Sequence, residues 1–145
     1  MKRRCSVNAS ILAALGIMVL FVCTGCVERV DLSGLWSGPL SFDQGDDMAG
    51  TARTLNLVLT QEGPVLSGKV GMELWIFSIL IPITRGSFAS GVISIEAAGE
   101  ITMYTDTSSI AMVLTGSYSA TELSGAGTYT VDGVVHHFTW DAHRS

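Results

Sequence analysis

The chain has 145 residues, which suits one domain with a sizeable core. Thirteen acidic residues against eight basic ones give a formal net charge of −5, which argues against a nucleic-acid partner because phosphates require a basic face. All three cysteines lie within the first 26 positions, so the sequence after them contains no thiol for a disulfide or a cysteine metal site.

Residues 1–25 have the pattern of an export signal, and we expect them to form a signal helix. Met1–Arg4 is basic, and Ile11–Val22 is apolar apart from Gly16. A basic start, an apolar run of about 7–15 residues and small residues near a cleavage site are typical of secretory signal peptides. The run is shorter than the roughly 20 residues that span a bilayer. An uncleaved anchor over Ala9–Val27 and a freely secreted protein stay open as alternatives.

The residues Cys23-Thr24-Gly25-Cys26 are similar to the lipobox of bacterial lipoproteins, in which small residues precede a cysteine. The chain differs from that family at Cys23, where leucine is preferred. The resemblance implies cleavage before Cys26, lipid attachment to the Cys26 sulfur and acylation, palmitate included, of the new amino terminus. Several acyl chains on one residue hold a protein on a membrane stably. We therefore expect a lipid-anchored protein of the cell envelope that faces the periplasm or the exterior.

Cleavage before Cys26 would remove three of the eight basic residues and no acidic residue, leaving a net charge of −8. That charge disfavours binding to anionic lipid headgroups, so the acyl chains would have to provide the membrane attachment. Residues 26–31 would form a lipidated tether. Within it, Val27–Asp31 spans at most about 17 Å when extended, which keeps the domain at 32–145 close to the membrane.

After the tether, short segments alternate between apolar and polar residues with a period of two, which predicts half-buried strands. Turn residues separate them, and Asp132-Gly133 is a strong signal for a two-residue hairpin. The expected strands and hairpins are Leu32–Phe42, Arg53–Gln61, Val65–Met72, Gly86–Ala97, Ile101–Tyr104, Ile110–Tyr118, Thr121–Val131 and Val134–Ala142. This pattern predicts an all-β fold, namely an antiparallel up-and-down β-barrel of about eight strands, with a β-sandwich as the alternative.

Trp75–Ile83 is the most apolar stretch after the signal and shows no clear alternation. One interpretation is a strand buried on both faces. The other is an exposed apolar rim that contacts lipid or a ligand, because exposed apolar patches usually mark contact sites. That rim would consist of Trp75, Ile76, Phe77, Ile79 and Ile81. We expect Pro82 to end regular strand pairing there.

Gly34-Leu35-Trp36 on the first strand, with Trp140 and Arg144 on the last, is similar to the calycin group, which includes the lipocalins. In that group a Gly-x-Trp ring closes the floor of the barrel, and a basic side chain near the C-terminus packs across it. The resemblance implies that Trp36 supplies the ring and Arg144 the cation, in a contact that contributes about 0.5–2 kcal/mol. Trp140 is the third residue of this expected floor.

Polar residues on the last strand suggest no metal site. His137, Asp141 and His143 share one face, but neighbours in such a row lie about 7 Å apart, so one zinc ion could join at most two of them. His136 should face inward, and no carboxylate partner for it is identifiable in the sequence. We therefore expect a solvated strand face and a core histidine.

The acidic loop Asp43–Thr51 contains Asp43, Asp46 and Asp47, whose oxygens could ligate calcium. The spacing of an EF-hand is missing, which favours a solvated loop. No nucleophile elbow and no phosphate-binding loop occurs either. We expect no cofactor and no catalysis. The predicted function is a non-catalytic binding or scaffold module for an envelope protein, and the alternative is a lipocalin-like carrier of a small hydrophobic ligand.

Overall fold

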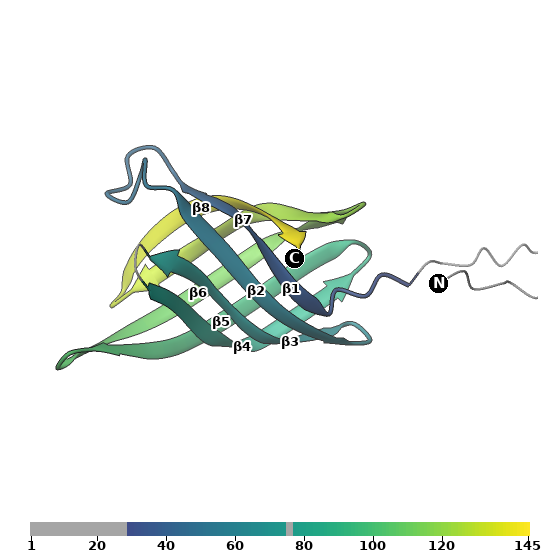
Figure 1. Ribbon diagram of the computed structural model, residues 1–145, viewed down its shortest axis with the longest axis horizontal. Coiled ribbons are helices and arrows are strands. Elements are labelled where there is room, and N and C mark those ends of the chain that lie inside the picture. The colour runs from purple at the N-terminus through teal and green to yellow at the C-terminus, as the bar shows by residue number, and fades with distance from the viewer. Residues whose placement is uncertain (1–28, 75–76) are drawn as a thin grey trace, which may run out of the picture.

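The computed structural model describes residues 29–74 and 77–145, which form a closed antiparallel β-barrel (Figure 1). Each strand pairs with the next one in the chain, and β8 pairs with β1 to close the sheet. The predicted up-and-down barrel is confirmed, and the β-sandwich alternative is wrong. The predicted signal helix lies outside the described residues. The eight strands are β1 (Gly34–Phe42), β2 (Arg53–Glu62), β3 (Val65–Leu74), β4 (Phe77–Ala89), β5 (Val92–Met103), β6 (Asp106–Ser119), β7 (Glu122–Val131) and β8 (Val134–Arg144).

The period-two pattern of the sequence decides which side chains fill the barrel. On β2, Leu55, Leu57 and Leu59 are buried, whereas the neighbouring Val58 and Thr60 are exposed. A register slip of one residue would turn every one of these leucines to solvent, so the pattern also specifies the register. The largest fully buried side chains are Trp36, Phe138, Leu32, Leu40, Leu55, Leu57, Leu66, Met72, Ile93, Ile95, Met112 and Leu114.

Glycines on β6 and β7 make room for the aromatic rings of β8. Gly116 pairs with Gly125 across these two strands. A Cβ atom at Gly116 would lie 3.0 Å from Cζ2 of Trp140, and one at Gly127 would lie 2.8 Å from Cζ of Phe138. Close approach of a ring to the backbone is a common reason for glycine within a strand. These glycines therefore set the positions of the two largest rings on the last strand.

Tight turns connect most strands as the sequence predicts. Asp132 and Gly133 have φ values of 47° and 85°, which is the geometry of the expected two-residue hairpin. The β5–β6 hairpin is longer than expected, because Glu100–Ser109 is paired strand almost to its tip. Thr102 and Thr107 face each other there with their hydroxyl oxygens 3.0 Å apart. The polar stretch therefore forms a ladder that projects beyond the barrel (Figure 1).

The expectation that Pro82 ends strand pairing is wrong. Pro82 lies inside β4 and pairs with Lys69 of β3. Pairing with β5 starts only at Ile83, and the register shifts between Ile83 and Arg85. Because proline lacks an N–H donor, it is tolerated beside such an irregularity more easily than inside a regular ladder. The irregular position lets β4 continue to Ala89.

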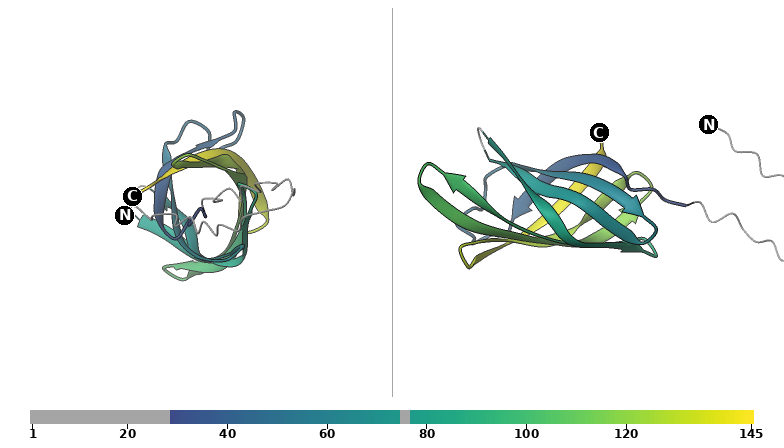
Figure 2. Two further views of the ribbon diagram at one scale, coloured as in Figure 1. Left: turned by 90° about the vertical axis from the view of Figure 1, so that its right-hand side faces the viewer. Right: turned by 90° about the horizontal axis from the view of Figure 1, so that it is seen from below.

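The barrel has two unlike ends (Figures 1 and 2). We call one the strap end, because residues 29–33 lie against it as a strap. The strap end also carries the β2–β3, β4–β5 and β6–β7 turns and the end of β8. We call the other the loop end, where the β1–β2 loop at residues 43–52 and the β5–β6 and β7–β8 hairpins lie. Most of the candidate residues belong to one of these ends or to the outer wall between them, and the others lie in the core.

Candidate functional site

The strap end is closed by backbone and amide hydrogen bonds around Leu32, which is fully buried. The Leu32 N–H donates to Oε1 of Gln61 at 2.7 Å, and Nε1 of Trp36 donates to the Leu32 carbonyl at 2.8 Å. The Gln61 N–H in turn donates to Oγ of Ser33 at 2.9 Å. Gln61 therefore fixes the strap to the end of β2. The sequence prediction did not identify Gln61. The alternation that turns Leu55, Leu57 and Leu59 inward continues to position 61 and could have indicated an inward side chain there.

The guanidinium of Arg144 lies over the Trp36 ring, with Cζ 4.9 Å from the ring centroid. Nη1 donates to the Ser33 carbonyl at 2.9 Å, and Nη2 donates to the Asp31 carbonyl. The other face of this floor is aromatic, since Tyr118 packs edge-on against Trp36 with the ring centroids 6.3 Å apart. Arg144 thus joins the strap, the first strand and the last strand.

Trp140 does not take part in the Arg144–Trp36 contact. It pairs with Leu40, further along β1, and its Nε1 donates to the Ala126 carbonyl at 3.1 Å. Its ring lies over the glycine pair of β6 and β7, inside the barrel. Of the three residues expected in the floor, the structure brings two together and places the third in the core.

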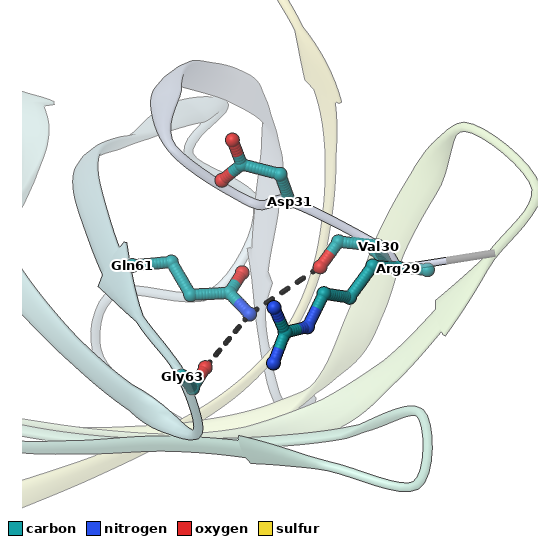
Figure 3. Close-up of a pocket in the computed structure, with 5 residues that line it drawn as sticks. All are labelled: Arg29, Val30, Asp31, Gln61 and Gly63. Carbon is teal, nitrogen blue, oxygen red and sulfur yellow. Dashed lines mark hydrogen bonds between the residues drawn. The ribbon is translucent and has the colours of Figure 1, made fainter. Parts of the chain in front are cut away.

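An open hollow of about 450 Å³ lies beside the strap, with Val30, Pro64, Phe88 and Tyr118 among its lining residues. A smaller neighbouring hollow of about 230 Å³ is shown in Figure 3. There the Gln61 amide lies between the carbonyls of Val30 and Gly63, to which Nε2 donates at 3.3 Å and 3.0 Å. Both hollows lie at the strap end. Aromatic rings line the larger hollow, whereas the Gln61 amide and backbone carbonyls line the smaller one.

The structure describes only some of the residues of the expected apolar rim. Ile79 and Ile81 are 5% and 2% exposed and belong to the core, so their assignment to an exposed rim is wrong. The physical reason is that β4 alternates after all, since Leu80 between them is 45% exposed. Phe77 begins β4. Trp75 and Ile76 lie outside the described residues.

At the loop end, His136 meets two carboxylates of the β1–β2 loop. Its Nδ1 lies 2.9 Å and 3.1 Å from the two carboxylate oxygens of Asp46 and 3.3 Å from Oδ1 of Asp47. The inward orientation of His136 agrees with the sequence prediction, but the expectation of no carboxylate partner is wrong. The partner lies 90 positions earlier in the chain, in a loop whose contacts no local pattern predicts.

Local hydrogen bonds hold the β1–β2 loop against β8. The Asp43 N–H donates to the His137 carbonyl at 3.0 Å, and the Met48 N–H donates to Oδ1 of Asp46 at 2.8 Å. This bond from Met48 is the main cause that lowers the pKa of the Asp46 carboxyl, and the bond with His136 adds to it. The Asp46 carboxylate is therefore fixed in place and favoured in its charged form.

The barrel interior at the loop end contains further polar groups. Arg53 shares the inward parity of Leu55, and within residues 29–74 and 77–145 its buried Nε and Nη1 have no hydrogen-bond partner. Burial raises the pKa of the Tyr129 hydroxyl, and the positive charge of Arg53 acts in the opposite direction. The Tyr129 ring also lies beside His136, with the centroids 6.3 Å apart. This end of the core is therefore polar, unlike the middle of the barrel.

The structure groups the polar residues on the outside of β8 differently from the sequence prediction. Asp141 and His143 approach to 4.0 Å, and Glu122 of β7 completes a group whose ligand atoms all lie within 4.8 Å. His137 is not part of this group. The sequence contains the clue to Glu122, because counting outward from the Asp132-Gly133 turn pairs Glu122 with His143. The group is open to solvent.

Comparisons with known proteins give no assignment: no protein-family model, no curated protein and no solved structure matches this chain. Among the residues that the structure describes, there is no helix long and apolar enough to cross a membrane.

Proposed function

We propose that this chain is a lipoprotein of the cell envelope, held on a membrane by acyl chains on Cys26 and facing the periplasm or the exterior. Its barrel acts as a non-catalytic binding or scaffold module for an envelope protein. Leu32 is already buried in the fold only six positions after Cys26. Six residues reach about 20 Å at most, so the strap end would face the membrane and the loop end would point away from it.

The packed interior is the observation that carries the proposal of a binding or scaffold module. Trp36, Leu57, Met112 and Phe138 come from four different strands and are all fully buried. An eight-stranded barrel is just wide enough to be filled by its own side chains or to hold one small ligand. Side chains of this size favour the filled state, so binding would use the outer wall, the loops and the ends.

The hollow beside the strap supports the alternative function, a carrier of a small hydrophobic ligand. Its volume of about 450 Å³ falls within the range of roughly 300–1,000 Å³ that ligand pockets have. Phe88 and Tyr118 line it and pack edge to face, with their centroids 6.3 Å apart. A ligand held there would lie at the mouth of the barrel next to the membrane and not in a lumen.

The anchor is tested with Cys26→Ser in the full chain, expressed in a bacterial host and followed by membrane fractionation and intact-mass measurement. We expect the wild-type chain to fractionate with membranes and to carry the mass of the acyl groups, and the variant to lose both. Cys23→Ser is the matched control, because it leaves Cys26 in place and should keep the lipid. Membrane association of the Cys26→Ser chain without added lipid would contradict the proposal.

Native mass spectrometry of the wild-type chain, released from detergent, distinguishes a module from a carrier. A module should show the mass of the acylated chain alone. A carrier should show additional non-covalent mass that is lost on Phe88→Ser, since that residue lines the hollow. Leu80→Ser, on the outer wall of the barrel, is the control and should leave any bound mass unchanged.

A further inference from the structure

We propose that Asp46, Asp47 and His136 form a binding site for a divalent transition-metal ion, with Zn²⁺ as the probe. The ion would fasten the β1–β2 loop onto β8 at the loop end. This inference does not depend on the lipid anchor or on the proposed function of the barrel. The sequence prediction of no metal site treated the loop carboxylates and His136 separately, and the fold brings them together.

The distances between the candidate ligand atoms suit one shared ion. In a tetrahedral zinc site with bonds of about 2.0–2.2 Å, neighbouring ligand atoms lie roughly 3.3 Å apart. Nδ1 of His136 is 2.9 Å from Oδ1 of Asp46 and 3.3 Å from Oδ1 of Asp47. All three ligand atoms lie within 4.8 Å of one another. Shifts of a few tenths of an ångström would be enough to place an ion among them.

The site combines two fixed ligands with one adjustable ligand. The side chains of His136 and Asp46 are 10% and 11% exposed, whereas that of Asp47 is 83% exposed. The His136 ring is held by Phe42, which packs edge-on at 6.2 Å, and by Tyr129. Asp47 can close onto the ion from the solvent side, which leaves the remaining coordination position open to water. Three protein ligands and a water molecule are a common zinc arrangement.

The donor set favours a transition metal over calcium. One imidazole nitrogen and carboxylate oxygens suit Zn²⁺ and similar ions, whereas Ca²⁺ requires about six to eight oxygen ligands. The ion would bind Nδ1 through its lone pair, so the hydrogen bond between Nδ1 and Asp46 would be replaced and the neutral ring would carry its proton on Nε2. The charges facing the ion are the two carboxylates, opposed by the Arg53 guanidinium that lies inside the same end of the barrel.

Calorimetric titration of the full chain in detergent, freed of metal with a chelator, tests the site with ZnCl₂ and CaCl₂. The outer group of Glu122, Asp141 and His143 could bind a second ion, so every chain carries Glu122→Gln. We expect one Zn²⁺ per chain at micromolar concentration, a rise in melting temperature with Zn²⁺, and no response to Ca²⁺.

Asp47→Asn is the decisive variant, because its exposed side chain can be changed without disturbing the fold. Even the loss of groups that only orient metal ligands weakens affinity by about 10–100-fold, so the loss of a ligand should cost at least that. Asp43→Asn is the matched control, since it lies in the same loop but outside the cluster, and should bind Zn²⁺ as the parent does. Equal affinity of the Asp47→Asn chain, an equal loss in Asp43→Asn, or no Zn²⁺ binding at all would overturn the proposal.

Discussion

The two ends of the barrel are closed by different kinds of interaction. At the strap end, Leu32, Gln61 and Arg144 are joined by hydrogen bonds to amides and carbonyls, and the guanidinium over the Trp36 ring stays charged at any ordinary pH. At the loop end, His136 meets Asp46 and Asp47. Histidine and carboxylate side chains bind both protons and metal ions.

The difference indicates that the strap end is built to stay closed, and that the loop end can respond to its surroundings. Neutral hydrogen bonds and an arginine contact keep their strength as pH or metal concentration changes. A histidine with two carboxylates does not, because protons and metal ions compete for the same atoms. The closed end faces the proposed anchor, and the responsive end points away from it.

The largest effect should come from removing the ring that closes the strap end. Trp36→Ala should destabilise the full chain by about 3–5 kcal/mol, as is usual when a large buried aromatic side chain is truncated. Denaturant unfolding followed by circular dichroism measures this. Leu35→Ala is the control on the neighbouring exposed residue and should change stability by less than about 0.5 kcal/mol. A loss below about 1 kcal/mol in Trp36→Ala would mean that the floor is not packed as described.

The loop end should loosen in acid through Asp46. Because the pKa of this carboxyl is lowered in the folded protein, its stabilising effect is present above its ordinary pKa, near pH 4, and is lost as the pH falls through the lower folded-state value. Asp46→Asn should therefore have a lower melting temperature than the wild type at pH 5, and the gap should narrow toward pH 2. Thermal unfolding across this pH range is the measurement.

Arg144→Met at the strap end is the control for the acid titration. Its guanidinium does not titrate, so the difference in melting temperature from the wild type should change less between pH 5 and pH 2 than it does for Asp46→Asn. Hydrogen bonds with Ser33 are the main cause that lowers the pKa of Asp31 at the strap end, and they are retained in Arg144→Met. The smaller effect of the Arg144 charge on Asp31 is lost, which leaves a weak acid-sensitive part in the difference. A constant gap for Asp46→Asn would refute the proposed role of its carboxylate.

The smallest effect should come from the tip of the β5–β6 hairpin. Tyr104 has a φ of 58°, which strains its backbone. Its side chain is fully exposed, so no packing against the described residues offsets that strain. Tyr104→Asn should stabilise the chain by about 0.5 kcal/mol, because asparagine tolerates this conformation. Thr105→Asn, one position along the same tip, should have no effect. A clear loss of stability in Tyr104→Asn would indicate a contact of the ring.

Much of the barrel could be predicted because its information is local. Alternation on β2 and the Asp132-Gly133 turn each need only a few neighbouring residues to be recognised. The prediction that Pro82 ends strand pairing was wrong because the sequence does not reveal the irregular pairing of β4 and β5 beside this proline. The length of the β5–β6 hairpin was underestimated, because its paired strands carry polar side chains and show no alternating apolar face.

The loop-end cluster could not be predicted for a different reason. The partner of His136 comes from a loop, and no periodicity places Asp46 beside a strand 90 positions away. The sequence could have indicated Glu122 through the register of the β7–β8 hairpin. It could have indicated Arg53 through the alternation of inward and outward side chains on β2. Ion clusters that join distant segments therefore need the closed fold before they can be seen.

Closure of the barrel by β1 and β8 affects how the chain folds. Ser37 and Ser145 lie within hydrogen-bond distance although they are 108 positions apart, so β1 and β8 meet only after all the strands between them have been synthesised. Contacts of such long range form slowly. Until then the exposed edge of the first strand can pair with other chains. A product truncated before β8 should therefore aggregate, because the outer edge of its first strand has no partner within the chain.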